Sequence, residues 1–150
     1  MNTRELFIVD DNADHRYIVL QVLNKFLPEY KFRLFDGGEQ LMACLSELNK
    51  AGDTGQLPAA IILDLHMPFY DGLQILKMLK NPAGENIKTA AIPVIIMTNI
   101  ENEQQVIDCY AAGASAYVKK PIDFVPLKDL LITICRFWVG SNRIPNLKVG

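Results

Sequence analysis

Residues 59–64 read AAIILD and residues 65–72 read LHMPFYDG, and together these two stretches decide the fold class. A short apolar run that ends in a single carboxylate is typical of a strand buried on both faces of a sheet. The proline and the glycine of the second stretch then turn the chain. From Leu73 to Leu79, apolar residues recur every three or four positions. The sequence here therefore predicts a strand, a turn and a helix in succession.

The same succession occurs five times along the chain. Apolar or alternating runs predict strands at residues 6–9, 31–36, 59–63, 94–97 and 115–118. Apolar residues at helical spacing predict helices at residues 18–27, 41–48, 73–79, 106–110 and 127–138. Long loops are expected at residues 49–58 and 81–93. These repeats predict an α/β fold in which a doubly wound parallel sheet carries helices on both faces.

The composition argues against several classes of protein. The chain has 150 residues, of which 50% are hydrophobic and 21% are charged, as is typical of one compact domain. Its net charge of −2 gives no reason to expect a nucleic acid or an anionic membrane as a partner. The three cysteines are widely spaced, and no apolar run approaches the length of a membrane span. We therefore expect a cytoplasmic protein without a disulfide framework.

Polar residues follow the predicted strands at their carboxyl ends, where such sheets bind ligands. They are Asp10 and Asp11 after the first strand, Asp64 after the third, Thr98 after the fourth and Lys120 after the fifth. Neighbouring carboxylates repel one another unless a cation lies between them, and oxygen ligands suit Mg²⁺. A lysine and a hydroxyl beside that cation suit a phosphoryl group, and a carboxylate can attack phosphorus to form an aspartyl phosphate.

Each of these residues taken alone has a simpler interpretation. Asp10 and Asp11 fit the N-cap region of a helix, and Thr98 fits a hydroxyl that satisfies backbone groups. Lys119 is expected in solvent, and His15 is expected on the exposed side of the first helix. It is the combination at one edge of the sheet that favours a functional site.

Several motifs in chain order resemble the receiver domain of two-component response regulators. They are the acidic pair at residues 10–11, Asp64-x-x-Met67-Pro68-x-x-Asp71-Gly72, Thr98 and Lys120-Pro121. The resemblance extends from Glu5 to Val139. It implies a (βα)5 flavodoxin-like fold with strand order 2-1-3-4-5. It also implies a bacterial phosphoprotein that catalyses only its own phosphorylation and dephosphorylation.

The resemblance assigns the metal ligands and the phosphoacceptor. Asp64 would accept the phosphoryl group and also ligate Mg²⁺. Asp11 would bind the ion directly, and Asp10 would bind it mainly through water. The backbone carbonyl of His66 would be a further ligand.

The resemblance also assigns the residues that respond to the phosphoryl group. Lys120 would contact its oxygens, Thr98 would donate a hydrogen bond to it, and Tyr117 would be the aromatic switch residue. The Lys120–Pro121 bond is expected to be cis. Asn99 is larger than the residue usual in the family, and with His66 and Ile100 it would affect the lifetime of the phosphoryl group.

These expectations define the partners and the boundaries of the domain. Residues 1–140 would form the receiver and residues 141–150 a tail, with no output domain. A sensor histidine kinase or phosphotransfer protein would donate the phosphoryl group, and a downstream protein would be the target. The last helix is apolar on more than one face, which indicates a homodimer or partner surface there or, alternatively, a C-terminal tail that folds back over it. The long loops and residues 136–138 faintly resemble regulators that partner phytochromes.

Two other functions fit parts of the pattern. One is a metal-dependent phosphohydrolase with an aspartyl-phosphate intermediate, although the usual Asp-x-Asp motif is replaced by adjacent aspartates. The other is a receiver-like module that docks partners without being phosphorylated.

Overall fold

The computed structural model describes residues 4–50, 57–67, 71–81, 87–99 and 102–142. Five strands form one parallel sheet in the order β2-β1-β3-β4-β5, which confirms the expected fold. The strands are β1 (Leu6–Val9), β2 (Phe32–Phe35), β3 (Ala60–Asp64), β4 (Val94–Thr98) and β5 (Ala116–Lys119). β2, whose sequence alternates between polar and apolar residues, lies at an edge of the sheet.

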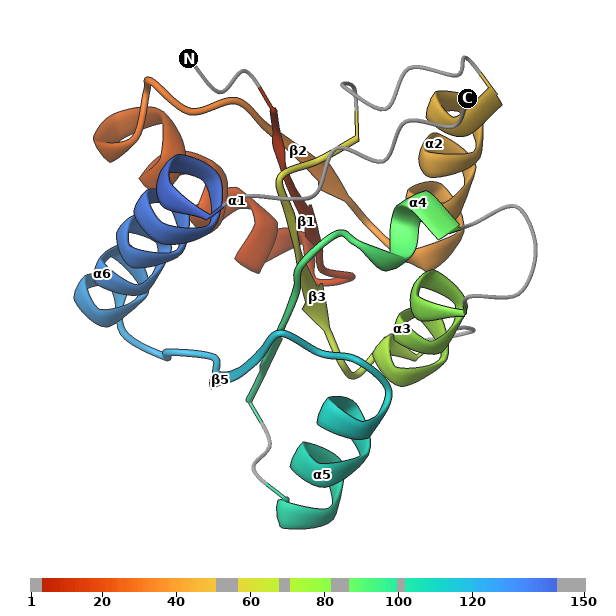
Figure 1. The fold of residues 1–150 in the computed structure, drawn as a ribbon. Helices are drawn as coiled ribbons and strands as arrows, with labels where there is room; N and C mark the ends of the chain where they lie inside the picture. Colours follow the sequence, from red (N-terminus) through yellow and green to blue (C-terminus); the bar gives the residue numbers. More distant parts are fainter. Residues whose placement is uncertain (1–3, 51–56, 68–70, 82–86, 100–101, 143–150) are drawn as a thin grey trace.

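Helices cover both faces of this sheet (Figure 1). They are α1 (Ala13–Phe26), α2 (Gly38–Lys50), α3 (Gly72–Lys80), α4 (Ile87–Ala90), α5 (Glu103–Ala111), α6 (Phe124–Ile134) and the π-helical segment η2 (Cys135–Ser141). α1 and α6 cover one face, whereas α2, α3 and α5 cover the other. None of the helices in the described part of the chain combines the length and the apolar character that crossing a membrane requires.

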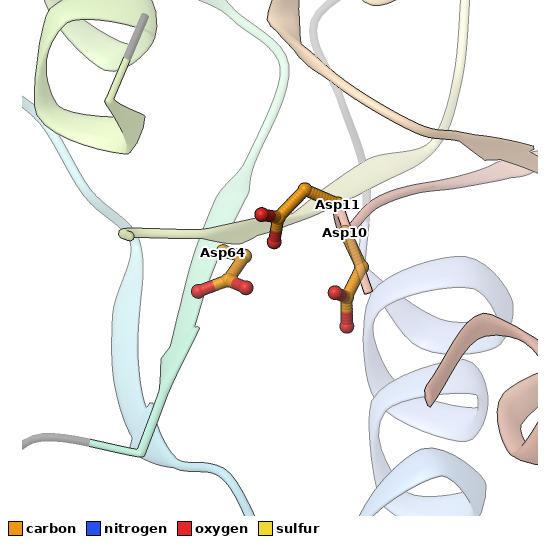
Figure 2. Close-up of side chains that lie close together, drawn as sticks. All are labelled: Asp10, Asp11 and Asp64. Carbon is orange, nitrogen blue, oxygen red and sulfur yellow. The ribbon is translucent and has the colours of Figure 1, made fainter. Parts of the chain in front are cut away.

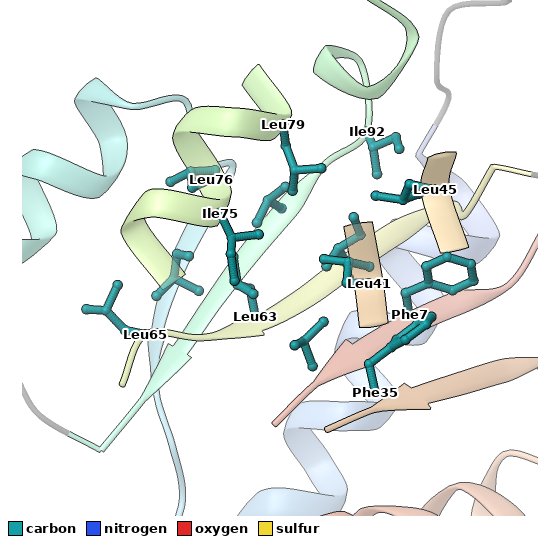
Figure 3. Packing of buried hydrophobic residues seen from close by; sticks show 14 of the residues in the cluster. Phe7, Phe35, Leu41, Leu45, Leu63, Leu65, Ile75, Leu76, Leu79 and Ile92 are labelled. Atoms are coloured by element: carbon teal, nitrogen blue, oxygen red, sulfur yellow. The ribbon is translucent and has the colours of Figure 1, made fainter. Parts of the chain in front are cut away.

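The sheet separates two hydrophobic cores, and β1 contributes to both. Phe7 and Val9 pack with α2 and α3 in one core, part of which is shown in Figure 3. Leu6 and Ile8 pack with α1 and α6 in the other. All four side chains are almost fully buried, because successive residues of a strand point to opposite faces of the sheet. This explains why the central strands read as continuous apolar runs.

The strands remain in register as far as their carboxyl ends. Val9 pairs with Leu63, and one residue later Asp64 pairs with Met97. Thr98 in turn pairs with Lys119. The polar residues that close these strands therefore come to the same edge of the sheet.

Two predictions of secondary structure need correction. The predicted loop at residues 81–93 contains the short helix α4, which is too short to show helical periodicity in sequence. Side chains hold this region to α3, because Thr89 donates to the carbonyl of Leu79 and Lys80 donates to the carbonyl of Ala90. The predicted single helix at residues 127–138 changes to a π-helix at Cys135.

Burial within the chain accounts for much of the apolar excess of the last helix. The buried residues of α6 and η2 are Leu127, Leu131, Ile134, Cys135 and Val139. Phe137 is 51% exposed and packs edge-on against Trp138. A homodimer through this helix stays a prediction.

Candidate functional site

Three carboxylates meet at the carboxyl edge of the sheet. Asp10 and Asp11 follow β1 directly, and Asp64 is the last residue of β3 (Figure 2). One carboxylate oxygen from each lies within 4.8 Å of those from the other two. Asp10 and Asp64 are buried, whereas Asp11 is exposed. The structure thus brings together the three acidic residues singled out from the sequence.

Lys120 brings a positive charge to this cluster from the loop after β5. Its Nζ lies 3.0 Å from Oδ2 of Asp10 and 3.6 Å from Oδ2 of Asp64. Its backbone N–H donates to the carbonyl of Thr98 at 2.7 Å, which holds the loop against β4. Lys119 is exposed, as expected. One ammonium group therefore lies beside two buried carboxylates, and its side chain is only 14% exposed.

Asp10 accepts hydrogen bonds from several directions. Its Oδ1 accepts from the backbone N–H of Asn12, and its Oδ2 contacts both Nδ1 of His15 and Lys120. Arg16 donates to its backbone carbonyl at 2.7 Å. Burial by itself would raise the pKa of Asp10, but the hydrogen bonds from His15, Asn12 and Lys120 outweigh burial and lower it. Asp10 is therefore held as a carboxylate.

The placement of His15 corrects the expectation that it lies on the exposed side of the first helix. Its side chain is 16% exposed and reaches Asp10. The reason is the cap of α1: Asn12 is the N-cap residue, and its side chain accepts from the backbone N–H of His15. The cap places the first turn of α1 over the end of β1. The pairing with Asp10 depends on that turn, and no motif in the sequence signals it.

Among the residues that the structure describes, Asp64 has fewer hydrogen-bond donors than Asp10. The backbone N–H of His66 donates to its Oδ1 at 3.2 Å. Burial raises the pKa of Asp64, and the charge of Lys120 lowers it. The negative charge of Asp10 raises it again, so that the pKa of Asp64 is raised overall. The side chain of His66 is exposed, and the role of its backbone carbonyl as a metal ligand stays a prediction.

The turn after Asp64 is shaped by Asp71 and Gly72. Asp71 caps α3 in a capping box with Gln74, in which each side chain accepts from the other residue's backbone N–H. A Cβ on Gly72 would lie 2.4 Å from the backbone oxygen of Asp64. Only glycine therefore allows α3 to begin so close to the end of β3.

Thr98 and Tyr117 lie on β4 and β5. Thr98 ends β4 and is fully buried. Tyr117 is half-buried, packs against the core beneath α2 and α3, and its backbone N–H donates to Oη of Tyr110 at 3.2 Å. The expectation of a cis Lys120–Pro121 bond is wrong, because the structure has this bond in the trans form that prolines generally favour. Asn99 is exposed, and Ile100 lies outside the described residues.

Comparison with known families identifies the family of this chain. The family model described as "Response regulator receiver domain" matches residues 6–132. This chain belongs to the receiver domain family. Its homologues act in two-component signalling.

Two relatives of this receiver domain align with it over most of their own length. "Response regulator Rcp1" of Synechocystis sp. is 28% identical over 140 residues, which cover 93% of this chain and 91% of that protein. "Probable methanogenesis regulatory protein FilR2" of Methanothrix harundinacea is 26% identical, with 93% and 86% covered. The crystal structure of the Mn(2+)-bound form of Rcp1 superposes with a TM-score of 0.77 at 25% identity, covering 95% of this chain and 99% of that one.

The acidic edge of this receiver domain fits a hard divalent cation. Its donors are carboxylate oxygens, which such ions prefer, and they lie close enough together to share one ion. Oxygen atoms also remain available, because Asp64 accepts one backbone hydrogen bond and Asp11 is exposed to solvent. The residues present therefore suit a divalent metal.

Proposed function

We propose that this chain is a single-domain response regulator that accepts a phosphoryl group on Asp64 in a Mg²⁺-dependent reaction. One observation carries the proposal: Asp64 is buried at the end of β3, with Lys120 Nζ 3.6 Å from its Oδ2 and two further carboxylates beside it.

The donor would be a phosphohistidine of a sensor kinase or phosphotransfer protein. A carboxylate oxygen of Asp64 attacks phosphorus, the phosphorus–nitrogen bond breaks, and the imidazole leaves with the bonding pair and takes up a proton. Bound Mg²⁺ would neutralise charge on the phosphoryl oxygens, and the residues that would hold it are Asp11, Asp64, Asp10 through water and the carbonyl of His66. Lys120, which lies beside Asp64, would contact another phosphoryl oxygen once its ion pair with Asp64 rearranges.

The output would be a change of surface rather than a chemical product. Thr98 would donate its hydroxyl to the new phosphoryl group, and Tyr117 would move inward. Because Tyr117 bonds to Tyr110 through its backbone, this movement would reach α5 as well as β5 and the start of α6. A partner protein that binds this surface, or a further phosphotransfer step, would carry the signal. Kinases linked to phytochromes are the first to test, because RcpA, a structure of the same fold, is described as a phosphorylated cyanobacterial phytochrome response regulator.

The test is phosphorylation of the purified chain with acetyl phosphate and Mg²⁺, followed by intact mass. We expect one phosphoryl group per chain that is stable in acid, labile in base and absent when the metal is chelated. Asp64→Asn should abolish labelling, whereas Asp36→Asn, at an exposed aspartate after β2, should leave it unchanged. Undiminished labelling of Asp64→Asn would contradict the proposal.

A further inference from the structure

We propose that His15 is a positioning residue of the metal site, which fixes the Asp10 carboxylate so that Asp10 can hold a water of the bound cation. This inference rests on the proposed function, because it concerns the same cation. It adds a residue of α1 to a site otherwise built from the ends of the strands.

The hydrogen bonds of Asp10 show how closely its carboxylate is constrained. A carboxylate offers about four lone pairs to donors. Asn12, His15 and Lys120 occupy three of these on Asp10, and they approach from the start of α1 and from the loop after β5. Such an arrangement fixes the plane of the carboxylate and leaves about one lone pair for a further donor. A water on a cation between Asp11 and Asp64 is a donor of the right kind.

The ring of His15 is itself fixed by its surroundings. It lines a small cavity whose apolar wall includes Val19, Met97 and Leu131. Among the described residues, its buried Nε2 has no hydrogen-bond partner. Nδ1 is therefore the nitrogen that binds the protein, and it donates to the carboxylate of Asp10.

A fixed carboxylate binds a cation's water shell better than a rotating one, because less conformational entropy is lost on binding. Removing a hydrogen-bond partner of a direct metal ligand typically costs 10- to 100-fold in metal affinity, and His15 acts on a carboxylate that reaches the ion through a water. Substitution of His15 should therefore weaken Mg²⁺ binding even though His15 does not touch the ion.

The experiment is a Mg²⁺ titration of the full chain, followed by amide chemical shifts, in three variants. His15→Leu keeps a similar volume and removes the donor, and it should weaken Mg²⁺ binding by up to about tenfold. His15→Asn can place an amide N–H where Nδ1 lies, and it should bind Mg²⁺ nearly as tightly as the wild type. Tyr17→Leu, at a residue 63% exposed on the same helix, is the control and should match the wild type.

A second readout concerns the ring itself. The chain has two histidines, so the imidazole ¹⁵N signals can be assigned with a His66 variant. We expect Nδ1 of His15 to carry a proton in the metal-free protein. A ring protonated only at Nε2 would overturn the proposal.

The outcomes separate this inference from the proposed function. A wild-type chain that binds no Mg²⁺ contradicts both. Normal wild-type binding with unchanged or tighter binding by a folded His15→Leu contradicts the positioning role alone. Equal weakening in His15→Leu and His15→Asn also contradicts it, because the lost donor would then not be the cause.

Discussion

Asp10 and Asp64 are neighbouring buried carboxylates that share one lysine, yet their pKa values are displaced in opposite directions. Asp10 accepts from His15, from a backbone N–H and from Lys120, and its pKa is lowered despite burial. Within the described part of the chain, Asp64 has one backbone donor and a more distant lysine, and burial raises its pKa. Burial alone therefore does not decide the state of an acid in this site.

The comparison shows how two similar residues can take different tasks. Asp10 is satisfied by the protein and is suited to a fixed electrostatic role. Asp64 is less well satisfied, so its oxygens are more available to a cation or to phosphorus.

Removal of the shared lysine should have the largest effect. Lys120→Met leaves buried carboxylates without their cation and should lower the free energy of unfolding by about 3 to 5 kcal/mol in metal-free buffer. Urea denaturation measures this, with Lys119→Met as the exposed control next to it. Mg²⁺ should restore more stability to Lys120→Met than to the wild type, because the ion replaces the missing charge. Equal stability of the two lysine variants would contradict the account.

Neutralising Asp10 should have the next largest effect. Asp10→Asn cannot accept in the same way from His15, Asn12 and Lys120, and the lost charge-assisted hydrogen bonds should cost about 1.5 to 3 kcal/mol of stability. Denaturant unfolding of metal-free protein tests this. A variant as stable as the wild type would show that these bonds contribute nothing net.

Neutralising Asp64 should have a smaller effect of opposite sign. Asp64→Asn removes a poorly satisfied charge and its repulsion with Asp10, so stability at neutral pH should rise by about 0.5 to 2 kcal/mol. The same unfolding experiment measures it. If Asp64→Asn folds correctly but is less stable than the wild type, the two aspartates do not differ in this way.

The pH dependence of these differences should be the subtlest effect. Asp10 has a lowered pKa, so its contribution is present above the unfolded value of about 3.9 and is lost as pH falls through its folded pKa. Asp64 has a raised pKa, so its contribution is present below about pH 3.9 and is lost as pH rises through its folded pKa. The deficit of Asp10→Asn should therefore shrink in acid, and the advantage of Asp64→Asn should appear only as pH rises. Unfolding curves measured across the acidic range test both trends. A deficit of Asp10→Asn that grows in acid, or an advantage of Asp64→Asn that is largest in acid, would contradict the two pKa directions.

The sequence predicts the sheet and its acidic edge because both follow from local patterns. Continuous apolar runs show strands buried on both faces, and parallel strands carry their final residues to one edge. Asp10, Asp11 and Asp64 could therefore be brought together without a structure. Gly72 could be placed in a turn, although its contact with the backbone of Asp64 could not be foreseen.

The features that sequence reasoning missed depend on how elements pack. His15 meets Asp10 only because the cap at Asn12 sets the start of α1 over the end of β1. α4 has too few residues for periodicity, and the change to a π-helix at Cys135 leaves no signature in apolar spacing. The hydrogen-bond donors that give Asp10 and Asp64 opposite pKa shifts belong to backbone and side-chain groups that meet these carboxylates only in the folded chain.

The most direct test of the account is to map the phosphorylated residue. The wild-type chain would be phosphorylated with acetyl phosphate and Mg²⁺, the acyl phosphate reduced with borohydride, and the modified residue located by peptide mass spectrometry. The account predicts modification at Asp64 alone. Modification at Asp10 or Asp11 instead would contradict it.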